Sequence, residues 1–244
     1  MERTVIENAA RGAAAKHLLR FTRFLDPAEM EDAQILARQY DLTVTAFGGY
    51  PDAERRIACF VPEGECPPEI TEYPLVCLHS AYDARYASLS HRDVLGAFMA
   101  LGLTRDCVGD MIVRDSQVYL FAVDTSQEYI RDNLTQAGKA GLRFRQIPFP
   151  AQSSLVSGTY RKATVASLRA DVLVAEAFDL SRAAAADAIH RGLVKVDWRA
   201  CQRVDVPLQA PAMLSLKGRG RVRLCSVDGM TKKQKFGITL FTFH

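Results

Sequence analysis

The chain has 244 residues, of which 48% are apolar, so it is long enough for two or three small domains that each bury a core. Residues 151–244 hold 15 Lys and Arg against 7 Asp and Glu, a balance of +8, whereas residues 1–150 hold 16 against 21, a balance of −5. The basic C-terminal third favours a nucleic acid as partner, and an accidental imbalance of surface charge is the alternative. Charged residues interrupt every long apolar run, so we expect no membrane span, no signal peptide and a cytoplasmic protein.

The first 70 residues predict an N-terminal α+β unit of two helices and a hairpin. Residues 3–25 carry apolar side chains at near-helical spacing and predict one long helix. Residues 26–40 predict a second helix, which is capped by an aspartate and has proline at its first position. Strands are expected at 42–47 and 56–61, on either side of a Gly-Gly turn.

Residues 71–150 predict six elements in the order β-α-β-β-α-β. This order is typical of the ferredoxin-like arrangement, which many RNA-recognition modules share with unrelated proteins. Tyr119 and Phe121 alternate on one strand and could stack on bases, but a place in the core under a helix is the preferred interpretation. The expected elements are strand 73–79, a helix from Ser90, strands 108–113 and 117–123, helix 125–137 and strand 142–147.

A third unit is expected over residues 160–244, after a linker that contains two prolines. Its first half predicts a pair of helices with Ser181 as the N-cap of the second and Gly192 at its C-terminal end. Its second half predicts short strands and a flexible cationic loop. The expected elements are helices 168–178 and 182–191, strands 194–196 and 213–216, a turn at 197–198 and the loop 217–221.

The third unit resembles the S4-like RNA-binding domain. The matching residues are Arg169, Asp171, Ser181, Arg182, Ile189, Gly192, Val194, Val196 and Asp197. Two departures stand out: Ala170 replaces the usual leucine, and Asp197-Trp198 replaces the usual Asn-Gly turn. Neither departure removes a basic residue, so the resemblance implies RNA binding by this unit.

The chemistry of the residues agrees with that implication. Ser181 opens a helix whose N-terminal amides can face a phosphate, and the guanidinium of Arg182 beside it can grip phosphate oxygens. The alternative is a plain helix cap followed by a solvated arginine. Asp171 is expected to be structural, pairing with Arg169 or bracing Arg182. The candidate RNA-binding residues are Arg169, Ser181, Arg182, Arg191, Lys195, Lys217, Arg219, Arg221, Lys232, Lys233 and Lys235.

The order of the three units and several sequence stretches resemble the bacterial YlmH family. These stretches are G-G-Y-P-D-A-E-R-R at 48–56, H-R-D-V-L-G-A-F-M-A-L-G-L at 91–103, V-G-D-M-I-V at 108–113, S-L-R-A-D at 167–171 and G-M-T-K-K-Q-K at 229–235. The resemblance implies an RNA-recognition-like middle domain, an S4-like C-terminal domain and ribosome-associated quality control on the large subunit with rRNA and tRNA as partners. The alternative is a protein-interaction factor of the cell-division apparatus with secondary RNA binding.

We expect no catalytic residues, no metal and no cofactor. The chain lacks the separate catalytic aspartate of a pseudouridine synthase, a Gly-rich loop between a strand and a helix, and a phosphate-binding loop. The six cysteines form no C-x-x-C pair, which predicts reduced core residues rather than a zinc site. The expected protein is a non-enzymatic RNA-binding monomer of the α+β class.

Overall fold

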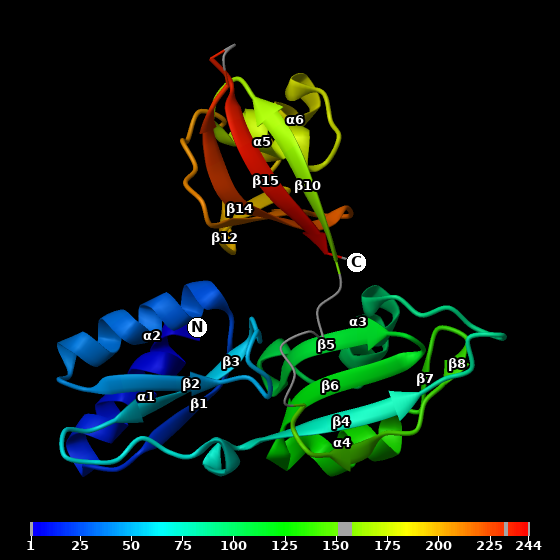
Figure 1. Cartoon of the computed structure of the whole chain (residues 1–244). Helices are drawn as coiled ribbons and strands as arrows, with labels where there is room; N and C mark the ends of the chain where they lie inside the picture. Colours follow the sequence, from blue (N-terminus) through cyan, green and yellow to red (C-terminus); the bar gives the residue numbers. More distant parts are fainter. Residues whose placement is uncertain (1, 151–157, 232–233, 244) are drawn as a thin grey trace. The chain divides into compact units, whose positions relative to one another are not determined.

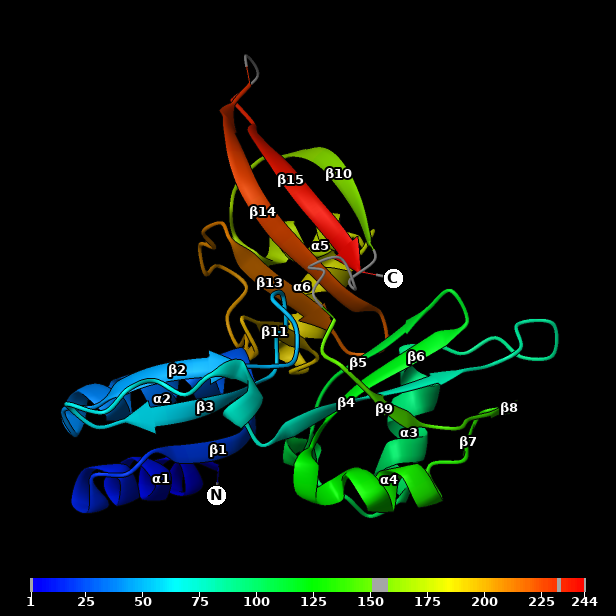
Figure 2. The same ribbon diagram turned by 60° about the horizontal axis from the view of Figure 1, so that its bottom comes forward.

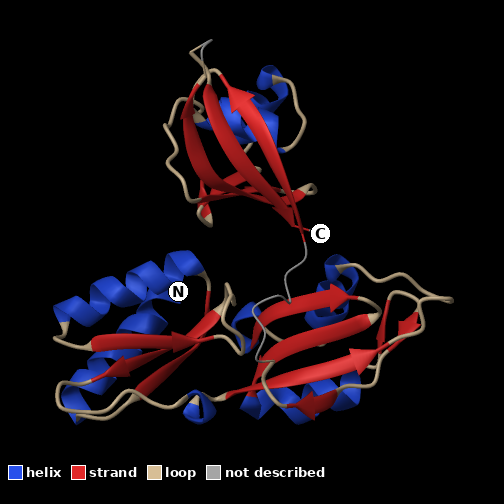
Figure 3. Ribbon diagram, viewed as in Figure 1, coloured by secondary structure: helices blue, strands red, loops and turns tan. Residues whose placement is uncertain are grey.

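The computed structural model describes residues 2–150, 158–231 and 234–243 (Figure 1). The chain divides into two compact units, Met1–Val156 and Ser157–His244, and each has a hydrophobic core of its own. Helices and antiparallel sheets occur in both units, so the chain is of the α+β class (Figure 3).

The N-terminal half of the first unit is a three-stranded antiparallel sheet with two helices on one face. Strand β3 (Arg56–Val61) lies between β1 (Arg20–Leu25) and β2 (Thr43–Phe47). Helices α1 (Glu2–Lys16) and α2 (Pro27–Gln39) pack on Ala58 and Phe60 of the central strand. The expected capping box at Asp26 is present, since Oδ1 accepts from the amide of Glu29 and the carboxylate of Glu29 accepts from the amide of Asp26.

The prediction of one helix over residues 3–25 is wrong in its second half. The helix ends at Lys16, His17 adopts a left-handed conformation with φ of 49°, and Arg20–Leu25 forms strand β1. Pairing with β3 decides this, because β1 gains an antiparallel ladder on both sides of a bulge between Phe21 and Phe24. Within the bulge, Thr22 accepts a hydrogen bond of 3.0 Å from the amide of Ala58. The unit therefore contains a third strand beside the expected hairpin.

The second half of this unit follows the order β-α-β-β-α-β with a short hairpin inserted before the last strand. Its sheet has the order β5-β6-β4-β9. The predicted helix 125–137 is shorter than expected, because residues 136–141 pair as that hairpin around Gly138. The elements are β4 (Leu75–Ala81), α3 (His91–Ala100), β5 (Val108–Arg114), β6 (Gln117–Val123), α4 (Gln127–Asn133), β7 (Gln136–Ala137), β8 (Ala140–Gly141) and β9 (Arg145–Ile147), with 3-10 turns η1 (Ile70–Glu72), η2 (Arg105–Cys107) and η3 (Asp124–Ser126).

A carboxylate joins the two halves of the first unit. Asp110 on β5 accepts hydrogen bonds from the hydroxyl of Tyr50 at 2.7 Å and from the amides of Glu54 and Arg55 at 2.8 and 3.3 Å. The guanidinium of Arg55 donates to the carbonyl oxygens of Phe24 and Val108. Two stretches that carry the family resemblance, 48–56 and 108–113, therefore meet here, and their hydrogen bonds link the two halves of one compact unit.

The second unit is a six-stranded antiparallel sheet with two helices. Its strand order is β10-β15-β14-β13-β11-β12, and the first three strands run side by side (Figure 2). Leu173 of α5 and Ile189 of α6 pack against Leu214, Val222 and Leu240 of the sheet. The elements are β10 (Gly158–Val165), α5 (Ala170–Ala177), α6 (Arg182–His190), β11 (Val194–Val196), β12 (Arg199–Ala200), β13 (Ala212–Leu216), β14 (Gly220–Met230) and β15 (Phe236–Phe243).

The flexible loop expected at 217–221 is instead a tight turn. Leu216 pairs with Gly220 across β13 and β14, and the amide of Arg219 donates to the carbonyl oxygen of Leu216 at 2.9 Å. Gly218 and Gly220 have φ of 88° and 92°, which glycine adopts without strain. Arg221 consequently lies on β14 rather than in a loop.

Candidate nucleic-acid interface

The first turn of α6 is built as the sequence predicts. Ser181 is the N-cap, and its hydroxyl oxygen accepts from the amide of Ala184 at 3.1 Å. Its carbonyl oxygen accepts from the amide of Ala185 at 3.0 Å. An anion at this end would therefore meet the amides of Arg182 and Ala183. The side chains of 183 and 184 are exposed and small, which leaves room for a backbone to approach, whereas Ala185 is in the core.

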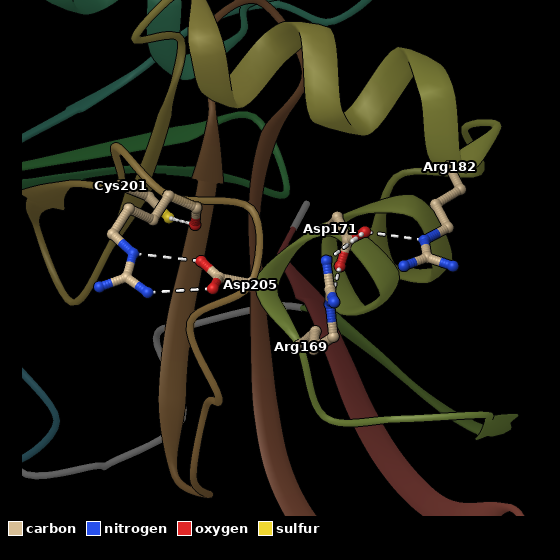
Figure 4. Close-up of polar contacts among 6 residues, drawn as sticks. Arg169, Asp171, Arg182, Cys201 and Asp205 are labelled. Atoms are coloured by element: carbon tan, nitrogen blue, oxygen red, sulfur yellow. Dashed lines mark hydrogen bonds and ion pairs between the residues drawn. The ribbon is translucent and has the colours of Figure 1, made fainter.

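Asp171 brings two of the predicted arginines together (Figure 4). Its buried carboxylate accepts from Nε of Arg182 at 2.7 Å and from Nε of Arg169 at 3.1 Å. The Asp171 side chain is only 5% exposed, whereas those of Arg169 and Arg182 are 39% and 62% exposed. In Figure 4 the dashed line from Arg182 to the carboxylate starts at Nε, so the residue can serve the fold with this nitrogen and a ligand with its terminal nitrogens.

The electrostatics of this pair favour the ionised carboxylate. Burial by itself raises the pKa of Asp171, but hydrogen bonds from Arg182 and Arg169 outweigh it and hold the pKa below its ordinary value. The predicted structural role of Asp171 is confirmed in both of its forms, since the residue pairs with Arg169 and also braces Arg182. The interpretation of Arg182 as a simply solvated side chain is wrong for the same reason.

A hollow of about 330 Å³ opens beside Arg182, between the end of β10 and the helix pair. Its lining includes Val172, Leu180 and two carboxylates, Glu176 and Asp179. Arg161 partly neutralises these acids, because its guanidinium donates to Glu176 at 2.6 Å and lies 3.9 Å from Asp179. A phosphate would be favoured at the Arg182 end of the hollow and disfavoured at the acidic end.

The other candidate residues fall into separate groups. Arg219 lies near the helix pair, because its guanidinium donates to the carbonyl oxygen of Phe178 at the end of α5. Arg191, at the far end of α6, pairs with Asp187 one turn earlier at 3.3 Å. Lys195 and Arg221 both pair with Ser215 across neighbouring strands, so they lie on one face of the sheet.

Four lysines complete the predicted set. Lys217 and Lys235 are exposed beside the β13–β14 and β14–β15 turns. Lys232 and Lys233 fall outside the described residues. The candidate residues that the structure describes therefore fall into several groups. Asp171 brings Arg169, the N-cap residue of α5, together with Arg182, which follows the N-cap Ser181 of α6.

Sequence reasoning missed an aromatic cluster in the second unit. Tyr160 on β10 lies beside Phe241 on β15, and Phe243 follows on the same strand. The guanidinium groups of Arg221 and Arg223 lie over the ring of Phe243. The alternation of residues 236–243 (FGITLFTF) was the available signal, since it places Phe241 and Phe243 on one face of a strand.

The base-stacking surface considered for the middle sheet is only partly available. Phe121 is fully buried and stacks on Tyr50 at a centroid distance of 5.1 Å, so it is core. Its ring packs against Gly49 and Tyr50 in the N-terminal half of the unit. Tyr119 is half-buried beside His79 at 5.0 Å and shares a cross-strand row with Ile112.

The cysteines and possible metal ligands were predicted to form neither a zinc site nor a disulfide. Within residues 2–150, 158–231 and 234–243, no three His, Cys, Asp or Glu side chains come together as metal ligands. All six cysteines are unpaired, and four of them are buried, whereas Cys66 is exposed and Cys225 is half-buried. Four of the six cysteines are therefore core residues. No helix in the described parts of the chain has the length and apolar character that a membrane crossing requires.

Comparison with known proteins identifies close similarities along the whole chain. Residues 3–62 match a family model described as "YlmH, N-terminal", and residues 68–151 match one described as "Putative RNA-binding domain in YlmH". The chain is 32% identical to the Ribosome-associated protein quality control protein P2 of Bacillus subtilis (strain 168) over 242 residues, which cover 98% of this chain and 94% of that protein.

A solved structure shares the fold of part of this chain. It is that of the Cell division protein ylmH from Streptococcus pneumoniae, with a TM-score of 0.51 and 20% sequence identity. The similarity covers 59% of this chain and 87% of that chain. At this level of identity, the likeness extends to the fold alone.

Proposed function

Because this chain belongs to the YlmH family, we propose that it is a non-catalytic RNA-binding protein that acts in ribosome-associated quality control. The relative from Bacillus subtilis carries ribosome-associated quality control in its name, and the family model over residues 68–151 is described as an RNA-binding domain. The partners in this proposal are rRNA and tRNA on the large ribosomal subunit, bound by a cytoplasmic monomer.

The proposal assigns a role to each part of the chain. Residues 1–70 form an N-terminal unit, residues 71–150 a ferredoxin-like domain of the RNA-recognition type, and residues 160–244 an S4-like domain. The strand order β5-β6-β4-β9 supports the second assignment. The helix pair, the cap at Ser181 and the Arg169–Asp171–Arg182 cluster support the third.

The observation that carries the proposed RNA contact is the position of Arg182. It stands on the first turn of α6, beside two amides that favour an anion, and 62% of its side chain is exposed. Asp171 holds its Nε and so fixes the guanidinium in place before any RNA arrives. A fixed arginine loses less side-chain entropy on binding than a mobile one, which favours affinity.

Sedimentation through a sucrose gradient tests the function. We expect the full chain to migrate with large ribosomal subunits and to leave them at high salt, because phosphate contacts weaken as salt rises. Arg182→Ala should reduce binding to ribosomal RNA by on the order of 1–3 kcal/mol. The matched control is Arg203→Ala, since Arg203 is also an exposed arginine paired with an aspartate, Asp205, at 3.0 Å.

The same experiment decides between this function and the alternative in cell division, which the name of the Streptococcus pneumoniae protein suggests. A chain that stays at the top of the gradient at low salt would favour a protein-interaction factor. A chain that migrates with ribosomes while Arg182→Ala behaves like the parent would retain the function but move the contact away from α6.

A further inference from the structure

The sheet of the second unit carries a cluster of aromatic and basic side chains on the side opposite its core. In β14 and β15, Val222, Leu224, Ile238 and Leu240 point into the core. The residues that alternate with them point the other way. This second side presents Tyr160, Arg221, Arg223, Phe241 and Phe243, which we call the aromatic–arginine patch.

The patch is assembled by strand register. Tyr160 pairs with Phe241, and Phe241 pairs with Arg223, so the three residues form one row across β10, β15 and β14. The rings of Tyr160 and Phe241 are 4.8 Å apart, and those of Phe241 and Phe243 are 4.9 Å apart. The guanidinium carbons of Arg221 and Arg223 lie 5.3 and 5.4 Å from the centroid of Phe243. The three rings and the two guanidinium groups therefore form one continuous cluster.

Packing in the core does not explain why position 160 is a tyrosine. Tyr160 is 73% exposed, so its aromatic surface contributes little to folding. Phe241 and Phe243 are half-buried, and Arg223 is exposed. Asp228 lies farther along the sheet, where it accepts from the hydroxyls of Ser226 and Thr239, and the charge of Lys162 lowers its pKa further. The five residues of the patch include no acid.

We propose that the aromatic–arginine patch is a second RNA surface that binds an unpaired strand, with bases stacked on Tyr160 and its neighbouring rings and phosphates held by Arg221 and Arg223. Unpaired bases have free faces that can stack on exposed aromatic rings, whereas bases inside a duplex are already stacked on one another. The two arginines and the net charge of +8 in residues 151–244 are complementary to the negative charge of a polynucleotide.

This surface differs from the proposed contact of α6 in both residues and ligand. Arg182 lies on a helix that packs on the core side of the sheet, whereas the patch lies on the other side. The first would hold the phosphates of a structured RNA, and the second would hold bases that are free to stack. The second surface rests on its own geometry, and the two can be tested separately.

The test measures fluorescence anisotropy of a labelled oligouridylate of about ten nucleotides with the full chain. We expect Tyr160→Ala to weaken binding about five-fold or more, as loss of one stacking ring does, and Tyr160→Phe to bind like the parent. Arg223→Ala should also weaken binding, and Arg223→Lys should recover part of the loss, since lysine keeps the charge but not the planar group.

A stable RNA hairpin in the same assay separates the two surfaces. Tyr160→Ala should leave hairpin affinity unchanged, whereas Arg182→Ala should lower hairpin affinity and leave that for oligouridylate unchanged. Melting curves of Tyr160→Ala should match the parent, because the ring is exposed. The proposal is wrong if the parent does not bind oligouridylate or if both patch variants bind it as the parent does. Loss of self-association in Tyr160→Ala, with RNA affinity intact, would make the patch a protein interface instead.

Discussion

Asp171 connects the fold of the second unit to its proposed RNA contact. The sequence motif predicts a structural aspartate near two arginines, and the structure adds that the aspartate is buried while both arginines reach the surface. Arg182 therefore has two tasks, one in the fold and one at the proposed interface. If Arg182 were only a solvated side chain, its replacement by alanine would change the free energy of unfolding by less than about 0.5 kcal/mol. Because the buried Asp171 would keep Arg169 but lose the hydrogen bond from Arg182, we expect a loss of about 1 kcal/mol or more.

The Asp171 cluster also predicts how the stability of the second unit depends on pH. The pKa of Asp171 is lowered in the folded chain relative to the usual value of about 3.9. The ionised carboxylate therefore stabilises the fold above that value, and this contribution is lost as the pH falls through the folded pKa. Asp171→Asn should lower the free energy of unfolding by about 1–3 kcal/mol at neutral pH. The difference from the parent should shrink in acid.

Urea unfolding followed by tryptophan fluorescence measures this effect. Trp198 is the single tryptophan and lies in the second unit, so its signal reports that unit. Asp205→Asn is the control, because hydrogen bonds from Arg203 also lower the pKa of Asp205 but 48% of its side chain is exposed. We expect that change to leave the free energy of unfolding close to that of the parent, because solvent screens an exposed ion pair. Equal losses in the two variants would show that burial adds nothing at Asp171.

At the scale of helices and strands, local signals predicted most elements of the chain. The bounds of β3 and β6 agree with the expected strands 56–61 and 117–123, and the predicted helix caps at Asp26 and Ser181 are present. Each of these elements has a local sequence signal at its end, either a capping side chain or a turn. Strand β1 has none, and only its pairing with β3 distinguishes it from a continued helix.

The same reasoning explains which parts of the candidate sites could be predicted. Arg169, Asp171 and Arg182 lie on two consecutive helices, so a short motif brings them together. Tyr160 and Phe241 lie near the two ends of the unit's sequence, and only the register of β10 with β15 makes them neighbours in space. Such a register depends on the whole sheet and is not encoded in any short stretch.

The joint at Asp110 leads to a prediction for the first unit. Asp110→Ala removes the acceptor for the hydroxyl of Tyr50 and for the amides of Glu54 and Arg55. Because these donors lose a charged partner, we expect the unit to be destabilised by about 2 kcal/mol or more. Calorimetry of the full chain should show the transition of this unit moving to lower temperature, while the unfolding that Trp198 reports stays unchanged.

Asp115→Asn is the matched control, since Asp115 pairs with Arg114 on the same sheet but its side chain is 81% exposed. Asparagine also tolerates the left-handed conformation that Asp115 adopts, with φ of 49°. Its transition should stay where the parent's is. If Asp110→Ala melted like the parent, the contacts of Tyr50 and Arg55 would not be what holds the two halves together.

For the whole molecule, the two compact units predict independent folding and unequal RNA binding. Residues 1–156 and 157–244 have separate cores, and the boundary falls in a stretch without charges, so the net charges are −5 and +8. We expect each fragment to fold alone, and the C-terminal fragment to bind a structured ribosomal RNA with an affinity that falls steeply as salt rises. Each phosphate contact should add about 0.7–0.9 to the slope of log affinity against log salt. The N-terminal fragment should bind weakly, because its acidic surface opposes the approach of RNA.

The opposite result is a definite alternative, because the family model that matches residues 68–151 is described as an RNA-binding domain. If the N-terminal fragment retained the affinity of the full chain and the C-terminal fragment had none, the main RNA site would lie on the middle sheet around Tyr119, and the basic C-terminal unit would need another partner.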